Sequence, residues 1–346
     1  MADFTGYGKY IAEKTGELVG IDSPTGYTEN AARFVKTVFE GLGYECRITR
    51  KGGVIVDLGG RNSENAILLE AHMDTLGGMV KEITPEGRLK ITNLGGMNAN
   101  NAEAENVHIV TKFSGTYEGT LQLVNASVHV NGEYNDTKRE WKNMEVVIDE
   151  KVSSKEDVKK LGIAVGDIVC FEPRFRVTEK GYIKSRFLDD KLSVGILMGF
   201  AKYLKDEDIE TDRRIYLHIT SYEEVGHGGS ASVPEGVTDA ISVDMGCVGT
   251  GLECRETDVS ICAKDSRGPY DYSLVKELIA AAGKMEASYA VDVYPYYGSD
   301  VEATLSAGND IRHGLIGAGV YASHGYERSH IDGAVNTLKT LIGLLA

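Results

Sequence analysis

Several histidines and carboxylates of this chain stand where short apolar runs end. His72 and Asp74 come directly after the run Ile67–Ala71, and the adjacent acids Glu223 and Glu224 come shortly after a similar run. A carboxylate two residues from a histidine can hold one ring nitrogen and so direct the other toward a metal ion. A single His-x-Asp is more often a structural histidine near an unrelated acid. The pattern supports a metal site only together with further potential ligands elsewhere in the chain.

Three more segments carry potential ligands. Asp189 and Asp190 stand at the start of a predicted helix, Asp244 ends the apolar run Ala240–Val243, and His324 lies in the segment SHGYERSH. Each has a structural alternative, such as a helix cap or a solvated loop acid. Acids at the end of a buried strand are nevertheless costly to bury unless a cation or a proton compensates them.

As a set, these residues suit two divalent metal ions, because imidazole and carboxylate ligands bind zinc, cobalt and manganese. Two ions about 3.5 to 4 Å apart can activate a shared water and polarise an amide carbonyl. Glu223 and Glu224 offer a metal ligand and a general base side by side, and a base is needed to carry a proton from the water to the leaving amine. The residues therefore predict two-metal amide hydrolysis.

The elements that must position these residues have an α/β pattern. Apolar periods and turn residues predict helices and strands bounded by polar caps and glycines. Because strands of an open α/β sheet direct their carboxyl ends into a crevice, we expect the ligands to meet there. The expected helices are 28–42, 193–205, 272–283 and one from about Ala334, and the expected strands are 54–58, 67–71, 214–220 and 240–243.

The region from about Gly78 to Cys170 has a different texture. Short alternating stretches such as LKITNL, VHIVTKF and EVVID are separated by Gly and Asn turns, with hardly any helical period. We predict an inserted β domain over residues 78–170 and a discontinuous catalytic domain over residues 1–77 and 171–346.

Composition excludes several classes of function. The 346 residues contain 37 Lys and Arg against 52 Asp and Glu, a net charge of −15, which disfavours nucleic acid and anionic lipid as partners. The five cysteines include no Cys-x-x-Cys pair, as expected for thiols in a reducing compartment. No apolar run approaches the roughly 20 residues of a membrane span, and the first residues lack a secretory pattern. We expect a cytoplasmic protein without membrane contact.

The motifs together resemble the glutamyl/leucyl aminopeptidase family of cocatalytic metallopeptidases, whose best-known members form tetrahedral particles and some of which have been labelled cellulase M. The resemblance extends over nearly the whole chain. It implies a three-layer, mixed-sheet metallopeptidase domain with an inserted small β-barrel-like domain that serves oligomerisation and substrate access. The motifs that carry it are AHMDTLGGMV, LGIAVGDIVCFEP, SRFLDDKLSVG, SYEEVGHGG, SVDMG, YYGSD and SHGYERSH.

The resemblance also implies roles for individual residues. Two divalent ions are expected, with zinc favoured and cobalt or manganese also suited. Asp300 matches a family acid near the site whose role stays open. The implied metal ligands are His72, Asp189 as the bridge, Glu224 and Asp244 each completing one ion's shell, and His324 on the second ion; Glu223 is the implied catalytic base and Asp74 orients His72.

The chain departs from the family pattern at three places. Thr75 replaces the usual acid after His-Met-Asp, the segment Arg50–Gly53 replaces an Asp-x-x-Gly-Asn motif, and the last segment reads HGYE. The preferred N-terminal residue of the substrate is therefore left open. Histidines outside the set are expected to be structural or to shape the pocket wall: His108, His129, His227 and His330.

The predicted function is metal-dependent removal of N-terminal residues from short peptides by a homo-oligomer, from dimer to dodecamer. Two alternatives remain: a dinuclear amidohydrolase acting on dipeptides or N-acyl amino acids, and a catalytically inactive metal-binding scaffold. Peptides with blocked N-termini would distinguish the aminopeptidase from the amidohydrolase. A missing metal ligand or base would indicate the inactive scaffold. The cellulase label has little support, since the only tryptophan, Trp141, offers a poor platform for a polysaccharide.

Overall fold

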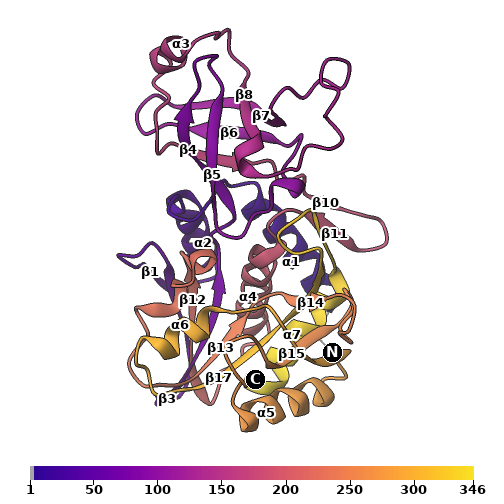
Figure 1. Ribbon diagram of the computed structural model, residues 1–346. Helices are drawn as coiled ribbons and strands as arrows, with labels where there is room; N and C mark the ends of the chain where they lie inside the picture. Colours follow the sequence, from indigo (N-terminus) through magenta and orange to yellow (C-terminus); the bar gives the residue numbers. More distant parts are fainter. Residues whose placement is uncertain (1–3) are drawn as a thin grey trace. The chain divides into compact units, whose positions relative to one another are not determined.

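The computed structural model describes residues 4–346, which divide into two compact units (Figure 1). The first unit contains the residues up to Asp74 together with Arg174–Ala346, and the second contains Thr75–Pro173. The second unit is thus an insertion between two parts of the first. Each unit is described by itself below.

The first unit is built on a 12-stranded mixed sheet. Its main path runs β1-β2-β12-β3-β13-β17-β18-β11-β10, with β14 and β15 also paired to β17, and β16 paired to β15. The central neighbours β12, β3, β13 and β17 are parallel, and the flanking pairs on the main path are antiparallel. The strands are β1 Glu45–Ile48, β2 Val54–Gly59, β3 Asn62–His72, β10 Arg176–Val177, β11 Tyr182–Ser185, β12 Arg213–Thr220, β13 Val237–Val243, β14 Gly246–Val248, β15 Val259–Lys264, β16 Tyr289–Val293, β17 Arg312–Tyr321 and β18 Glu327–His330.

Helices cover both faces of this sheet. Residues 66–72 of β3 are all buried, as the unbroken apolar run predicts for a central strand. On one face, α4 packs against β3 and β13 and also contacts α1 and α7. On the other face, Glu70 of β3 receives a hydrogen bond from Thr304 of α6, so the sheet lies between two helical layers. The helices are α1 Phe4–Val19, α2 Glu29–Gly41, α4 Leu188–Asp206, α5 Tyr272–Lys284, α6 Asp300–Ser306 and α7 Ile331–Leu345.

The predicted elements are present, but α4 begins at Leu188 rather than at Ser193, and two further differences lie at the C-terminal end of the chain. The last helix begins at Ile331 rather than near Ala334, because the His330 side chain caps it by accepting the Asp332 N–H at 3.0 Å. The central strand β17 has no clear pattern in the sequence because it contains three glycines. At one of them, Gly317, an added Cβ would lie 1.6 Å from the Asp244 carbonyl oxygen, so close backbone approach rather than strand propensity selects the residue.

The second unit is a closed barrel of six antiparallel strands in the order β4-β5-β8-β7-β6-β9. Alternate residues of its strands are buried, as in β8, where Met144, Val146 and Ile148 point into the core. The mixed α/β class and the barrel-like insert predicted from the sequence are both confirmed. The elements are β4 Gly77–Ile83, β5 Leu89–Leu94, β6 Asn106–Val110, β7 Thr116–Leu123, β8 Met144–Ile148, β9 Ile168–Phe171 and the helix α3 Lys155–Lys160.

None of the helices in residues 4–346 combines the length and apolar character that a membrane crossing requires. The five cysteines are free thiols, and three of them, Cys170, Cys254 and Cys262, are buried.

Candidate metal centre and active site

Three neighbouring parallel strands end where the candidate ligands stand. The last residues of β3 and β12, His72 and Thr220, are paired in register, and β13 pairs Ser242 with Glu70 of β3. Three positions therefore reach the same edge of the sheet. They are His72, Ser221 directly after β12, and Asp244 directly after β13. The Glu223–Val225 turn (η3) follows β12 at this edge. The register thus brings ligands from separate strands together, as expected at the carboxyl edge of an α/β sheet.

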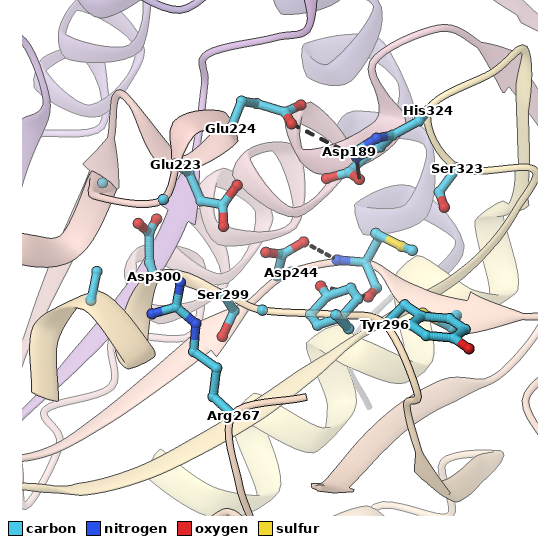
Figure 2. A pocket seen from close by; sticks show the side chains of 17 residues that line it. Asp189, Glu223, Glu224, Asp244, Arg267, Tyr296, Ser299, Asp300, Ser323 and His324 are labelled. Atoms are coloured by element: carbon cyan, nitrogen blue, oxygen red, sulfur yellow. Dashed lines mark hydrogen bonds and ion pairs between the residues drawn. The ribbon is translucent and has the colours of Figure 1, made fainter. Parts of the chain in front are cut away.

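Asp189, at the start of α4, lies between two histidines. Its Oδ1 is 3.2 Å from His72 Nε2, and its Oδ2 is 3.6 Å from His324 Nε2. Glu224 Oε2 is 3.7 Å from the same nitrogen of His324. Figure 2 shows Asp189, Glu224 and His324 close together in the pocket. A carboxylate with one oxygen facing each imidazole occupies the position that a ligand shared by two ions would need.

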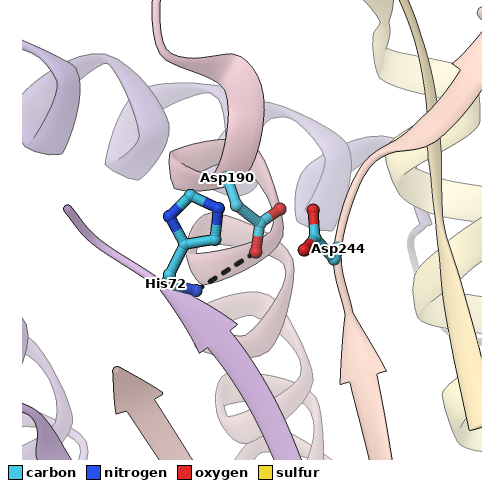
Figure 3. A group of neighbouring side chains, drawn as sticks. All are labelled: His72, Asp190 and Asp244. Atoms are coloured by element: carbon cyan, nitrogen blue, oxygen red, sulfur yellow. Dashed lines mark hydrogen bonds between the residues drawn. The ribbon is translucent and has the colours of Figure 1, made fainter. Parts of the chain in front are cut away.

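His72 also belongs to a second group, with Asp190 and Asp244 (Figure 3). One potential ligand atom from each of the three lies within 4.8 Å of the others, and the same holds for His72, Asp189 and Glu224. Asp190 Oδ2 accepts the main-chain N–H of His72 at 3.2 Å. No role for Asp190 follows from the sequence, because two adjacent aspartates look alike in the local pattern and the family resemblance implies a role for Asp189 alone.

Asp74 braces the two glutamates as well as His72. Its Oδ1 accepts the Glu223 N–H at 3.2 Å and its Oδ2 accepts the Glu224 N–H at 3.4 Å, while Thr25 donates a hydrogen bond at 2.7 Å. The contact with His72 Nδ1 at 2.9 Å is made by the Asp74 carbonyl oxygen, whereas the carboxylate is 3.8 Å away. Asp74 is fully buried, so its side chain fixes the turn that carries Glu223 and Glu224.

Burial and mutual repulsion make this acidic cluster electrostatically unfavourable by itself. Burial raises the pKa of Glu223, Glu224 and Asp190 well above the usual range of a carboxyl group. The pKa of Asp244 is raised to about 7, first by burial and then by the charge of Asp189. Asp189 differs, because His72 lowers its pKa by hydrogen bonding and charge despite its burial. Positive charge at this position would stabilise the cluster.

The donor set fits divalent metal ions. Asp190 Oδ1 is buried and has no hydrogen-bond partner among the described residues, and buried carboxylates are normally paired or bound to metals. The ligands available are imidazole nitrogens and carboxylate oxygens, which suit zinc, cobalt and manganese. The geometry groups His72 with Asp190 and Asp244 and also with Asp189 and Glu224. His324 lies near Asp189 and Glu224.

A cavity of about 440 Å³ opens beside the cluster, and it is lined entirely by residues of the first unit. Glu223 lines it, and its Oε2 is 3.7 Å from His72 Nε2. The opposite wall carries Tyr296 and Arg267 (Figure 2). Asp300 also lines the cavity; its Oδ2 accepts a hydrogen bond from Thr220, and burial raises its pKa to about 6.

Two further residues support the site although the sequence did not indicate them. The buried Glu327 accepts main-chain N–H groups from the two segments that carry Asp189 and His324. Lys51, in the segment that departs from the family pattern, donates to the carbonyl of Gly228 at 2.8 Å and so anchors the loop after Glu224. Its place in the histidine-bearing segment SHGYERSH was the only sequence signal for Glu327, and the sequence contained none for Lys51.

The extra histidines have other contacts. His330 caps α7 and binds the Lys180 carbonyl through Nε2 at 2.7 Å, in agreement with the structural role predicted for it. His227 is exposed and stacks on Tyr222 with ring centroids 5.2 Å apart. His108 and His129 belong to the second unit, outside the group of candidate ligands.

Comparison with known proteins agrees with this architecture. Residues 52–340 match the family described as M42 glutamyl aminopeptidase. The chain is 43% identical over 325 residues to "Putative aminopeptidase YhfE" of Bacillus subtilis (strain 168), which covers 94% of each chain. It is 24% identical over 228 residues to the lysyl aminopeptidase of Pyrococcus furiosus, covering 65% of this chain and 63% of that protein.

The solved structures that it resembles include the Pyrococcus horikoshii TET1 peptidase, described as assembling into a tetrahedron or a large octahedral shell. The TM-score is 0.85 at 23% identity, over 96% of this chain and 98% of that one. The likeness supports the fold, and the family match extends over both units and every candidate ligand. On these grounds the chain is an aminopeptidase, a hydrolase of peptide bonds, and belongs to the M42 glutamyl aminopeptidase family.

Proposed function

We propose that this aminopeptidase removes N-terminal residues from short peptides with the help of two divalent metal ions held at the strand edge. The observation that carries the proposal is the position of Asp189, with one carboxylate oxygen 3.2 Å from His72 and the other 3.6 Å from His324. His72 and Asp244 would complete the shell of one ion, and His324 and Glu224 that of the other. When bound, such ions acidify water and polarise a carbonyl group.

Glu223 is the proposed general base. Its carboxylate lines the cavity beside His72 and belongs to neither triad of potential metal ligands. It is therefore available to take a proton from water and return it to the departing amine. The Asp74 carboxylate holds the Glu223 main chain at 3.2 Å, which limits movement of the base. Asp189, Asp244 and Glu224 provide the negative charge that neutralises the cations.

The acids around the cavity also favour a free α-amine on the substrate. Asp300 is suited to this task, since it lines the cavity beside Glu223 and Asp244. A substrate with a blocked N-terminus lacks the positive charge that these acids would attract. The alternative, an amidohydrolase acting on dipeptides or N-acyl amino acids, would accept such substrates.

The test uses protein stripped of metal and reconstituted with zinc, cobalt or manganese, with zinc expected to serve. Free and N-blocked peptides of the same sequence are compared, using wild type, Glu223→Gln and the control Glu235→Gln at an exposed position of the same unit. Loss of the base should reduce kcat by about 100-fold to 10,000-fold with metal content unchanged. Cleavage of only blocked peptides would favour the amidohydrolase, and no cleavage with two metals bound would identify an inactive scaffold.

Homo-oligomerisation through the barrel unit is a second part of the proposal. It is supported by the assembly described for the TET1 peptidase, and an enclosed particle would restrict the substrates to short peptides. Light scattering after size-exclusion chromatography gives the mass directly, and a monomer at micromolar concentration would contradict the idea.

We also place the protein in the cytoplasm, because its five cysteines are free; recovery from an exported fraction of the cell would refute this.

A further inference from the structure

The segment between α1 and α2, residues 20–28, contacts the parts of the chain that carry the proposed ligands. None of these nine described residues is among those that line the cavity. Three of the side chains are buried and carry a hydroxyl group, namely those of Ser23, Thr25 and Thr28. Buried hydroxyl groups are normally hydrogen-bonded, and here the partners lie just after the ends of β3 and β12, at the candidate active site.

Thr25 is held in a tight turn of its own. The Tyr27 N–H donates to the Pro24 carbonyl at 2.7 Å and closes the turn. Gly26 has a φ of +87°, which glycine adopts without strain, and the ring of Pro24 fixes the φ of the residue that opens the turn. The place of the Thr25 hydroxyl is therefore set locally, independently of the groups that it contacts.

Two of the hydroxyl groups bind the chain directly after β3. Ser23 Oγ donates to the Met73 carbonyl at 2.8 Å, and Thr25 Oγ1 donates to Asp74 Oδ2 at 2.7 Å. The proposed ligand His72 is the last residue of β3. The segment thus fixes both residues that follow this ligand.

The Asp74 carboxylate passes this constraint to the turn with the two glutamates, which are seen next to each other in Figure 2. Its Oδ1 accepts the Glu223 N–H at 3.2 Å, and its Oδ2 accepts the Glu224 N–H at 3.4 Å. The contact with the Thr25 hydroxyl, at 2.7 Å, is the shortest of the three. Since hydrogen bonds weaken as they lengthen, the hydroxyl holds the carboxylate more firmly than the turn does. The turn is therefore positioned by a carboxylate that Thr25 orients.

The same segment is also joined to the ends of two other elements. Thr28 Oγ1 lies 3.0 Å from the hydroxyl oxygen of Ser221, directly after β12. From the start of α4, Lys191 donates to the carbonyls of Leu18 at 3.0 Å and Ile21 at 2.7 Å. The first turn of α4 and the chain after β3 and β12 are thus attached to one short stretch of chain, which limits movement of Thr25 relative to all three.

We propose that Thr25 is a positioning residue of this aminopeptidase. By orienting the Asp74 carboxylate, its hydroxyl sets where the turn presents Glu223 and Glu224. The inference rests on the proposed function, in which Glu223 is the base and Glu224 is a metal ligand. Thr25 acts through Asp74, since it is not among the described residues that line the cavity.

The experiment removes the hydroxyl and keeps the shape. Thr25→Val lacks only the donor, Thr25→Ala lacks it without filling any new space, and Thr25→Ser retains it. The matched control is Thr340→Val on α7, a fully buried threonine whose hydroxyl bonds the Asn336 carbonyl at 2.9 Å and which does not line the cavity. Melting temperatures of the metal-free proteins check that each variant is folded.

The first readout is cleavage of a free peptide by zinc-reconstituted protein. Thr25→Val and Thr25→Ala should lower kcat by about tenfold to hundredfold with little change in KM, as for loss of a group that supports an active-site residue. Thr25→Ser should restore most of the rate, and Thr340→Val should behave as wild type. If Thr25→Ser were as slow as Thr25→Val, the shape of the side chain rather than its hydroxyl would matter, and the proposal would fall.

The second readout is zinc affinity, measured by competition with a chromogenic chelator, and it does not depend on turnover. Displacement of Glu224 in Thr25→Val should weaken binding of one zinc ion by about tenfold, and Thr25→Ser should restore it. Such a result supports the inference even if wild type cleaves no peptide, in which case only the proposed function fails. An active wild type beside a Thr25→Val variant with the kcat and the zinc affinity of Thr340→Val would overturn the inference and leave the proposed function standing.

Discussion

The carboxylate of Glu327 accepts a hydrogen bond from the main-chain N–H of Asp189 at 3.1 Å. Its other oxygen accepts the N–H of His324 at 3.0 Å. A single buried side chain therefore holds the segments of two proposed ligands that are more than 130 residues apart in the chain. The separation of Asp189 Oδ2 and His324 Nε2, 3.6 Å, depends on this contact.

We expect Glu327→Gln to weaken metal binding, because its amide NH2 cannot accept one of these two N–H groups. The ion assigned to His324 should lose about tenfold to hundredfold in affinity, as is usual when a group supporting a ligand is changed. Competition with a chromogenic chelator measures this. Glu179→Gln, at an exposed position of the same unit, serves as the control, and equal affinities in the two variants would show that Glu327 does not position the ligands.

The two adjacent aspartates should differ in their effect on metal stoichiometry. Asp189→Asn removes the proposed bridge and should weaken both ions, whereas Asp190→Asn changes the group that accepts the His72 N–H at 3.2 Å and should weaken chiefly one, by about tenfold to hundredfold. Elemental analysis after dialysis gives the stoichiometry. If Asp190→Asn lost more metal than Asp189→Asn, the bridge would have been assigned to the wrong residue.

Removing the ions should destabilise the protein, because buried carboxylates around Asp189 then repel one another. Metal at a free concentration about 100 times its Kd would add about 2.7 kcal/mol to the free energy of unfolding. Thermal melting with and without chelator, followed by readdition of zinc, measures the change. A melting temperature that stayed constant after complete removal of metal would contradict this account of the cluster.

Gly228 is a test of crowding behind the catalytic turn. A Cβ at this position would lie 2.1 Å from Asp300 Oδ1 and 3.0 Å from the Cα of Glu223, so Gly228→Ala must displace one of them. A shift of about 1 Å in a reacting group can cost about 100-fold in rate, and we expect kcat to fall by up to that factor. Gly249→Ala, where a Cβ meets nothing within 4 Å, should retain wild-type kcat.

Asp239 should contribute stability that depends on pH. Arg312 donates to both of its oxygens at 2.7 Å, and Arg213 donates at 2.5 Å. Burial would raise the pKa of Asp239, but the hydrogen bonds from the two arginines outweigh it and lower the pKa. The contribution is therefore present above the unfolded pKa of about 3.9 and is lost as the pH falls through the lower folded value.

Asp239→Asn should accordingly reduce the free energy of unfolding by about 3 kcal/mol at neutral pH, as for loss of one partner of a buried ion pair. Denaturant titrations from pH 7 to pH 3 should show the difference from wild type shrinking in acid. A difference that grew as the pH fell would reverse the sign expected from these contacts. Asp239 lies near the start of β13, away from the ligand end, so metal affinity should not change.

Local patterns in the sequence determined much of the fold and most of the candidate ligands. The apolar run before His72 predicts a buried strand that ends at that histidine, and the structure has β3 ending there. The apolar run before Asp244 likewise forms a buried strand, β13, which ends directly before that aspartate. These features can be predicted locally, because an apolar run and the polar residue that ends it lie within a few positions of one another in the sequence.

Only the tertiary structure decided how residues far apart in the chain meet. It placed Asp189 between His72 and His324, brought Glu327 beneath two ligand segments, and set Arg267 opposite the acids of the cavity. It also formed β17 from a segment whose glycines hide the strand pattern. The physical reason is that strand register and helix packing set these distances, and both depend on the whole sheet rather than on any short stretch of sequence.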